Sequence, residues 1–317
     1  MSRNSPSTIK ARARSVWTVC AACSAITISI LSLAGSASSY DIVRFLGLYP
    51  VDLVDIAKCL VLILILFAGP LFEEGIVEGN WRYWLRWDIF RGTVFDDWIG
   101  WRNLVVGPVS EELVFRSLSV SLFLLAQVSS LSCYIMRSRL KTAIQAEPRD
   151  IIFSTPLIFG LAHLHHLNEH IVTHQRHDQT YLAAVLTPSI ILPGIVRALF
   201  QLIYTSLFGF FTTFLFLRTG NLYSCILAHS FCNWMGLPRV WGRVGNVISE
   251  EAERVVENRD SDKNVSTLQD RLASGRSGWS HGTSWTVAYY VLLFTGAFGF
   301  YKLLWPLTES ANRLAVL

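Results

Sequence analysis

Three groups of polar residues interrupt otherwise apolar stretches, and their residue types could carry out hydrolysis. They are Glu111 and Glu112 with Arg116, Phe159 with His163, and His229 with Asn233. On a helix, an i,i+4 spacing places both members of a pair on one face. Ionisable groups at membrane depth usually mark a functional site. The three faces together predict a polar site inside a bundle of helices.

The first group carries the acid–base chemistry. The segment Pro108-Val109-Ser110-Glu111-Glu112 predicts the start of a helix, with Ser110 as its cap and both acids in the first turn. Glu112 and Arg116 can then pair across one turn, whereas Glu111 projects about 100° around the helix and stays available. Burial disfavours the charged form of a carboxylate and makes it more basic, which suits Glu111 to deprotonating water.

Glu73 and Glu74 provide an internal comparison, because they also follow an apolar run but have Glu78 one turn later instead of an arginine. A double glutamate alone therefore identifies no site, and two acids that complement a helix dipole remain the simpler alternative. A single buried histidine or asparagine is likewise often a contact between helices. The three groups are informative because they occur together.

The composition indicates a membrane protein, since 52% of the residues are hydrophobic, 16% are charged and the mean hydropathy is +0.40. Uncharged runs cover residues 17–39, 59–72, 117–136, 151–162, 180–196, 198–217, 219–238 and 282–301. A membrane helix needs roughly 20 apolar residues. We expect an all-α fold, a polytopic transmembrane helical bundle with about seven or eight membrane helices around a polar intramembrane cavity.

The net charge of +4 is modest, and the basic residues are scattered among boundary segments rich in tryptophan. Such segments are typical of a membrane interface and exclude a nucleic-acid patch. The basic N-terminus, with no acid before the first apolar run, predicts a cytosolic location for this end. A cleaved signal peptide is the alternative, because the small residues at 34–39 would suit a signal peptidase.

We expect one integral membrane domain over residues 1–317, with the catalytic core at 107–238. Residues 243–281 are strongly polar and predict a solvated loop that is partly disordered. The six cysteines lie mostly within apolar runs, so they imply no disulfide framework.

The three groups resemble the motifs of the eukaryotic Ras-converting CAAX prenyl endopeptidases, the type II CAAX proteases, within the wider CAAX protease and bacteriocin-processing family. The pattern E-E-x-x-x-R is met by Glu111-Glu112-Leu113-Val114-Phe115-Arg116, F-x-x-x-H by Phe159-Gly160-Leu161-Ala162-His163, and H-x-x-x-N by His229-Ser230-Phe231-Cys232-Asn233. The motifs occur in the expected order, and the resemblance spans roughly residues 107–238.

The resemblance implies an intramembrane endopeptidase that removes the C-terminal aaX tripeptide from prenylated CAAX proteins. The expected substrates are farnesylated or geranylgeranylated proteins such as Ras-like small GTPases, which bring their own membrane anchor. The resemblance also implies a multi-pass protein of the endoplasmic reticulum membrane, in contact with lipid, that uses no cofactor or metal.

The family's residue roles fall on the residues of the three motifs. Glu111 is the expected base and His163 is expected beside the attacking water, while His229 and Asn233 stabilise the oxyanion. Glu112 and Arg116 are expected to form a supporting pair, and Phe159 to shape the pocket.

Two other interpretations compete with this one. Six of the eight histidines lie between His163 and His177, and His166-Leu167-Asn168-Glu169-His170 fits the H-x-x-E-H pattern of a zinc protease. That site would still need a further acidic ligand, and a polar loop at the membrane edge is the simpler explanation of these histidines. A non-catalytic membrane scaffold or a transporter is the other alternative, although the sequence shows no repeated halves.

Overall fold

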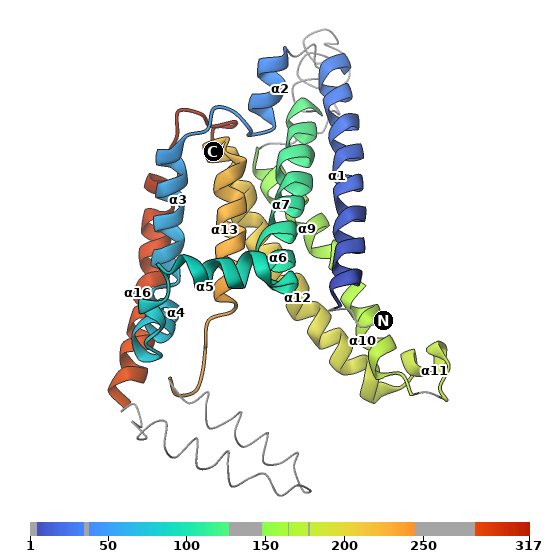
Figure 1. The fold of residues 1–317 in the computed structure, drawn as a ribbon. Coiled ribbons are helices and arrows are strands. Elements are labelled where there is room, and N and C mark those ends of the chain that lie inside the picture. Colours follow the sequence, from blue (N-terminus) through green and yellow to red (C-terminus); the bar gives the residue numbers. More distant parts are fainter. Residues whose placement is uncertain (1–4, 35–37, 127–147, 164, 177, 245–282) are drawn as a thin grey trace, which may run out of the picture.

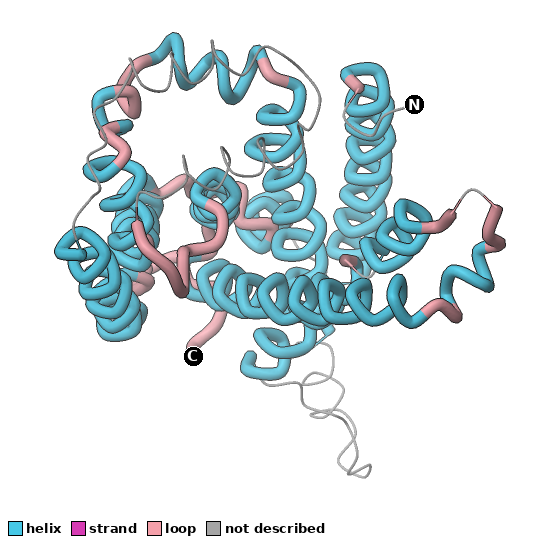
Figure 2. The backbone as a smooth tube through the Cα atoms, turned by 90° about the horizontal axis from the view of Figure 1, so that it is seen from below, coloured by secondary structure: helices cyan, strands magenta, loops and turns pink. Residues whose placement is uncertain are grey.

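The computed structural model describes residues 5–34, 38–126, 148–163, 165–176, 178–244 and 283–317. These residues form helices, turns and loops with no strand among them, which confirms the all-α prediction for this part of the chain (Figures 1 and 2). The α-helices are α1 (Pro6–Ala34), α2 (Ser39–Phe45), α3 (Leu53–Leu66), α4 (Ala68–Phe72), α5 (Trp87–Arg91), α6 (Trp98–Trp101), α7 (Gly107–Glu112), α9 (Pro148–Ala162), α10 (His165–His174), α11 (Tyr181–Val185), α12 (Pro188–Thr219), α13 (Leu222–Met235) and α16 (Thr283–Leu307).

Between these helices lie several turns with a different pitch. Four are π-helical, namely η1 (Glu73–Val77), η3 (Gly92–Asp96), η4 (Arg102–Val106) and η5 (Leu113–Leu118), and η2 (Asn80–Arg82) is a 3-10 turn. A π-helical turn holds one more residue than an α-helical turn and often occurs near a functional site. Two of the four, η4 and η5, flank α7.

Three of the described helices, α1, α12 and α16, are long and apolar enough to cross a membrane. A fourth candidate is the pair Leu53–Leu66 and Ala68–Val77, which is bent by 77°. The predicted count of about seven or eight membrane helices is therefore not confirmed. The runs at 180–196 and 198–217 were expected as two helices, but α12 contains most of both because Arg197 lies on its exposed side. The run at 117–136 continues beyond the described residues.

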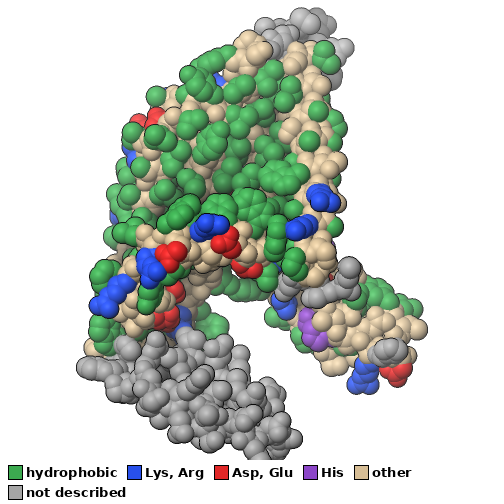
Figure 3. Space-filling model, viewed as in Figure 1, with side chains coloured by type: hydrophobic (Ala, Val, Ile, Leu, Met, Phe, Trp, Pro, Cys, Tyr) green, Lys and Arg blue, Asp and Glu red, His purple; other side chains and the backbone are tan. Residues whose placement is uncertain are grey.

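In Figure 1, α3 and α16 stand in contact at one flank and α1 stands at the other, while α12 runs obliquely between them toward the lower right. The short helices α5 and α6 run across the molecule at the level of the lower parts of α1 and α13, and α12 and α16 continue below them. In Figure 3, charged side chains gather along that level, and the surface above is largely apolar. A segment that lies across the bundle and carries Trp87, Trp98 and Trp101 has the orientation and composition of a membrane interface.

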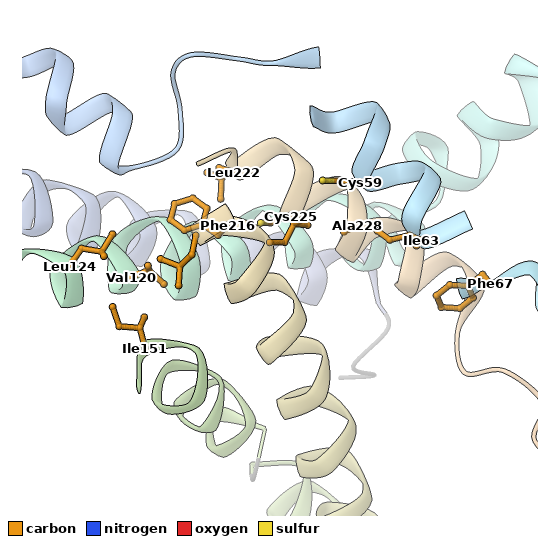
Figure 4. Close-up of a cluster of buried hydrophobic side chains, with 12 residues drawn as sticks. Cys59, Ile63, Phe67, Val120, Leu124, Ile151, Phe216, Leu222, Cys225 and Ala228 are labelled. Carbon is orange, nitrogen blue, oxygen red and sulfur yellow. The ribbon is translucent and has the colours of Figure 1, made fainter. Parts of the chain in front are cut away.

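One buried cluster joins the helices that carry the three motifs (Figure 4). It includes Ile63 from α3, Val120 from the helix that continues η5, Ile151 from α9, Phe216 from α12 and Cys225 from α13. Between helices in lipid, close packing replaces the hydrophobic effect as the main attraction. The cluster fixes the relative positions of segments that are distant in sequence.

Helices α9 and α12 approach especially closely, and two glycines permit it. A Cβ built at Gly209 would lie 2.7 Å from the Cβ of Pro156, and a Cβ at Gly160 would collide with Ser206 Oγ. Small residues at such crossings let two backbones come together. The glycine that follows Phe159 thus holds this motif against α12.

Candidate active site

The glutamate pair lies at the end of α7, so the prediction that it occupies a first helical turn is wrong. Helical backbone already begins at α6 and runs through η4 into α7. Ser110 is no cap, because its hydroxyl donates to the carbonyl of Val106 at 2.7 Å. Pro108 would normally interrupt a helix, but the wide turn of η4 directly before α7 accommodates it.

The two glutamates point into different surroundings. The side chain of Glu112 is completely buried, whereas that of Glu111 is 34% exposed. Glu112 Oε2 lies 3.1 Å from Arg116 Nε, and both side chains are sealed from solvent. The expected pairing of Glu112 with Arg116 is therefore present, and Glu111 remains available to the cavity described below.

Arg116 contacts a partner that sequence reasoning missed. Its Nε donates a hydrogen bond to Thr212 Oγ1 at 2.8 Å. Because the Nε hydrogen points to Thr212, the attraction between Arg116 and Glu112 is an electrostatic one between opposite charges. The guanidinium also lies over the Phe159 ring, 4.6 Å from its centroid. Because Thr212 is one of several hydroxyl residues in an otherwise apolar run, its type and spacing give no signal in the sequence.

Glu112 also orients the histidine of the third motif. Its Oε1 lies 2.8 Å from His229 Nδ1, and an ionised carboxylate can only accept, so Nδ1 carries the hydrogen. His229 Nε2 lies at the other end of the ring, 3.9 Å from Glu111 Oε2. The Phe208 ring packs against the imidazole at 4.7 Å. Glu112 thus connects Arg116 on one side to His229 on the other.

His163 is oriented in a comparable way by its own motif. Its Nδ1 lies 2.8 Å from the carbonyl oxygen of Phe159, which can only accept, so this nitrogen is the donor. In the neutral ring, Nε2 is then a hydrogen-bond acceptor. The ring of Phe159 packs at 4.8 Å from that of His163 and at 5.0 Å from that of Phe115.

Asn233 connects α13 to η4. Its Nδ2 donates to the carbonyl of Asn103 at 2.9 Å, and Ser230 one turn earlier donates to the carbonyl of Leu104 at 2.9 Å. An amide nitrogen carries two hydrogens, so the second one stays available for another acceptor.

A cavity of about 760 Å³ brings the predicted residues together. Its wall includes Glu111, His163, His229 and Asn233, together with Phe159. Another part of the wall is apolar and includes Ile63, Phe67, Tyr204, Leu207, Phe208, Phe211 and Phe300. Glu112 and Arg116 lie behind the polar wall and support it.

The histidine-rich segment forms α10, and His166 at its start also lines the cavity. His166 Nδ1 lies 3.1 Å from Glu169 Oε2, while the rings of His170 and His174 stack at 4.1 Å. Among the described residues, no group of three histidine, cysteine or acidic side chains has an arrangement that could hold a metal ion. The H-x-x-E-H pattern of this segment thus gains no support as a zinc centre.

Comparisons with known proteins agree with the motifs. Residues 93–235 match the family model described as "Type II CAAX prenyl endopeptidase Rce1-like". The "Probable CAAX prenyl protease 2" of Schizosaccharomyces pombe is 34% identical over 246 residues, which cover 78% of this chain and 74% of that protein. This chain belongs to the type II CAAX prenyl endopeptidase family.

Two further members of the type II CAAX prenyl endopeptidase family match over shorter lengths. "CAAX prenyl protease 2" of Arabidopsis thaliana is 39% identical over 149 residues, covering 47% of this chain and 38% of that protein. The Homo sapiens protein of the same name is 33% identical over 208 residues, covering 62% of this chain and 50% of that protein. No solved structure matches the chain. Family membership and the long apolar helices together make this a membrane protein.

Proposed function

We propose that the protein is an intramembrane endopeptidase that removes the C-terminal aaX tripeptide from prenylated CAAX proteins. The main support is the meeting of three motifs, from segments far apart in the sequence, around one cavity to which they contribute a carboxylate, two histidines and an amide. These are the groups that water-dependent peptide hydrolysis requires, and the family relationship points to the same reaction.

Glu111 acts as the general base in this mechanism. It takes a proton from a water molecule, and His163 Nε2 accepts the second hydrogen of the same water and so fixes its orientation. The water oxygen attacks the scissile carbonyl and forms a tetrahedral oxyanion. Glu111 then returns the proton to the leaving amine nitrogen as the C–N bond breaks, which restores the carboxylate.

His229 and Asn233 stabilise the oxyanion. His229 acts in its doubly protonated form, with Nδ1–H on Glu112 and Nε2–H directed to the cavity. Asn233 uses the amide hydrogen that is not given to Asn103. Preorganised donors of this kind lower the barrier because they need little reorganisation as charge develops. Arg116 completes the arrangement by holding the Glu112 carboxylate.

The apolar wall of the cavity fits the lipid part of such a substrate. Leu207 lines the cavity and is 60% exposed, and Tyr204 beside it is also exposed, so this side opens toward the lipid-facing surface of α12. An isoprenoid can therefore remain among apolar side chains while the peptide reaches the polar wall. The proposed substrates are farnesylated or geranylgeranylated proteins, including Ras-like small GTPases, and the proposed location is the endoplasmic reticulum membrane with the cavity open to the cytosol.

The test is tripeptide release from a farnesylated CAAX peptide by membranes that contain equal amounts of wild-type protein, Glu111→Gln or Glu74→Gln. Glu74 is the control because it also belongs to a double glutamate but accepts a hydrogen bond from Asn80 outside the cavity. We expect Glu111→Gln to lower the rate by about 10²–10⁴-fold and Glu74→Gln to leave it unchanged. No release by the wild type would refute the activity, and wild-type rates in Glu111→Gln would refute the assignment of the base.

A further inference from the structure

Arg102 places a guanidinium in the wall of the cavity that contains Glu111. Among the described residues that line this cavity, it is the one lysine or arginine. It is half-buried at the first position of η4, where its Nε donates to Asn103 Oδ1 at 2.9 Å. None of the three motifs includes it. On the basis of the proposed function, we infer that Arg102 binds the terminal carboxylate of the substrate and so sets where the substrate is cut.

The spacing between Arg102 and Glu111 fits a tripeptide. The two residues line one cavity and are nine positions apart, which at the α-helical rise of 1.5 Å per residue would be about 13 Å along the axis, and the π-helical turn η4 between them shortens this distance. Three extended residues span about 10–11 Å. A scissile carbonyl beside Glu111 would therefore bring the carboxylate within reach of the Arg102 side chain.

Gly107 keeps the path between the two residues open. It lines the cavity, and a Cβ built there would lie 3.2 Å from the carbonyl oxygen of Arg102 and 3.8 Å from Glu111 Oε1. The absent side chain leaves the helix backbone bare at the place that an extended tail would cross. Larger residues at this position would narrow the passage.

The charges of the cavity favour a substrate orientation in which the terminal carboxylate lies at Arg102, away from Glu111. A free carboxyl terminus is negative, and Glu111 repels it, so the terminus is stable only at a distance from the base and next to a cation. Arginine suits this task because its planar guanidinium binds a carboxylate through two parallel hydrogen bonds. The opposite orientation would bring two negative groups together at the site of proton transfer.

The backbone around Arg102 is fastened to the proposed oxyanion site. The carbonyl of Asn103, the next residue, accepts from Asn233 Nδ2, and the carbonyl of Leu104 accepts from Ser230. Arg102 and Asn233 therefore keep a fixed separation, so that one end of the tail is positioned relative to the bond that is cut.

The test compares two farnesylated peptides that differ only at the end, one with a free carboxylate and the other with a terminal amide. Both are given to wild-type protein, Arg102→Met, Arg102→Lys and the control Arg91→Met. Arg91 is an exposed arginine of the neighbouring α5, where it pairs with Asp96 outside the cavity. The kinetic constants kcat and KM are measured for each combination.

We expect the wild type and Arg91→Met to prefer the carboxylate about 10- to 100-fold in kcat/KM, mainly through KM. Arg102→Met should lose the preference for the carboxylate and cleave the amidated peptide as well as the wild type does. Arg102→Lys should keep part of the preference. An unchanged preference in Arg102→Met, or an equal loss on both peptides, would overturn the inference. Equal cutting of both peptides by the wild type would overturn it too, whereas no cutting of either would refute the proposed function itself.

Discussion

Arg116→Met tests whether the buried ion pair supports the site in the way its geometry indicates. The arginine is 1% exposed and Glu112 is completely buried, so the substitution leaves a carboxylate inside the protein with only His229 as a partner. Thr212 also loses the donor that its hydroxyl accepts from. The variant keeps most of the apolar stem that packs beside Phe159.

The expected loss of stability follows from this burial. Removing one partner of a buried ion pair typically costs about 3–5 kcal/mol, because the remaining charge is uncompensated. For a protein of this size we expect the midpoint of thermal unfolding to fall by roughly 6–20 °C. Replacing both partners by neutral groups of similar shape is much less costly.

The double variant Glu112→Gln with Arg116→Met therefore separates stability from catalysis. It should recover at least half of the stability lost in Arg116→Met, because no buried charge is left alone. Tripeptide release should stay low, since the doubly protonated form of His229 has lost its carboxylate partner.

The assay measures thermal unfolding in detergent beside cleavage of a farnesylated CAAX peptide by the same preparations. A double variant less stable than Arg116→Met would refute the reasoning about uncompensated charge. A double variant with wild-type activity would show that Glu112 does not prepare His229 for the reaction.

Three further substitutions test other contacts. Thr212→Val should lower the free energy of unfolding by about 1–3 kcal/mol because Arg116 loses a buried acceptor. Thr212→Ser keeps the hydroxyl and should have nearly the wild-type stability, and thermal unfolding of the two variants would show the difference. Gly160→Val should abolish activity and lower the unfolding midpoint because its side chain collides with Ser206; a normal midpoint would contradict the close crossing of α9 and α12. Asn233→Leu should reduce kcat by about 10²–10³-fold with little change in KM, as expected for an oxyanion donor, and a pure KM effect would assign it to binding instead.

The pairs within each motif could be predicted because they depend on helix geometry alone. Glu112 and Arg116, or Phe159 and His163, meet wherever the segment is helical. The contact between Arg116 and Thr212 joins residues 96 positions apart, and it depends on how α12 packs. Nothing local to either residue encodes it.

Helix boundaries were predicted less well, for two physical reasons. Ser110 has the residue type of a cap, but a π-helical turn carries the preceding helix through Pro108, so Ser110 bonds backward to Val106. Arg197 divides two apolar runs in the sequence, yet it only marks the exposed side of one long helix. A polar cavity could be predicted from the three motifs, but the residues of its apolar wall depend on tertiary packing.

The wide turn η5 directly after Glu112 has a consequence for engineering. Forcing this segment into a regular α-helix without removing a residue would pass the extra residue of the turn along the chain and rotate all that follows by about 100°. The contact between Arg116 and Thr212 on α12 would then be lost. A designer who regularised this helix would improve its hydrogen-bond ladder and dismantle the support of the site, so the irregularity should be preserved in any stabilised version of the protein.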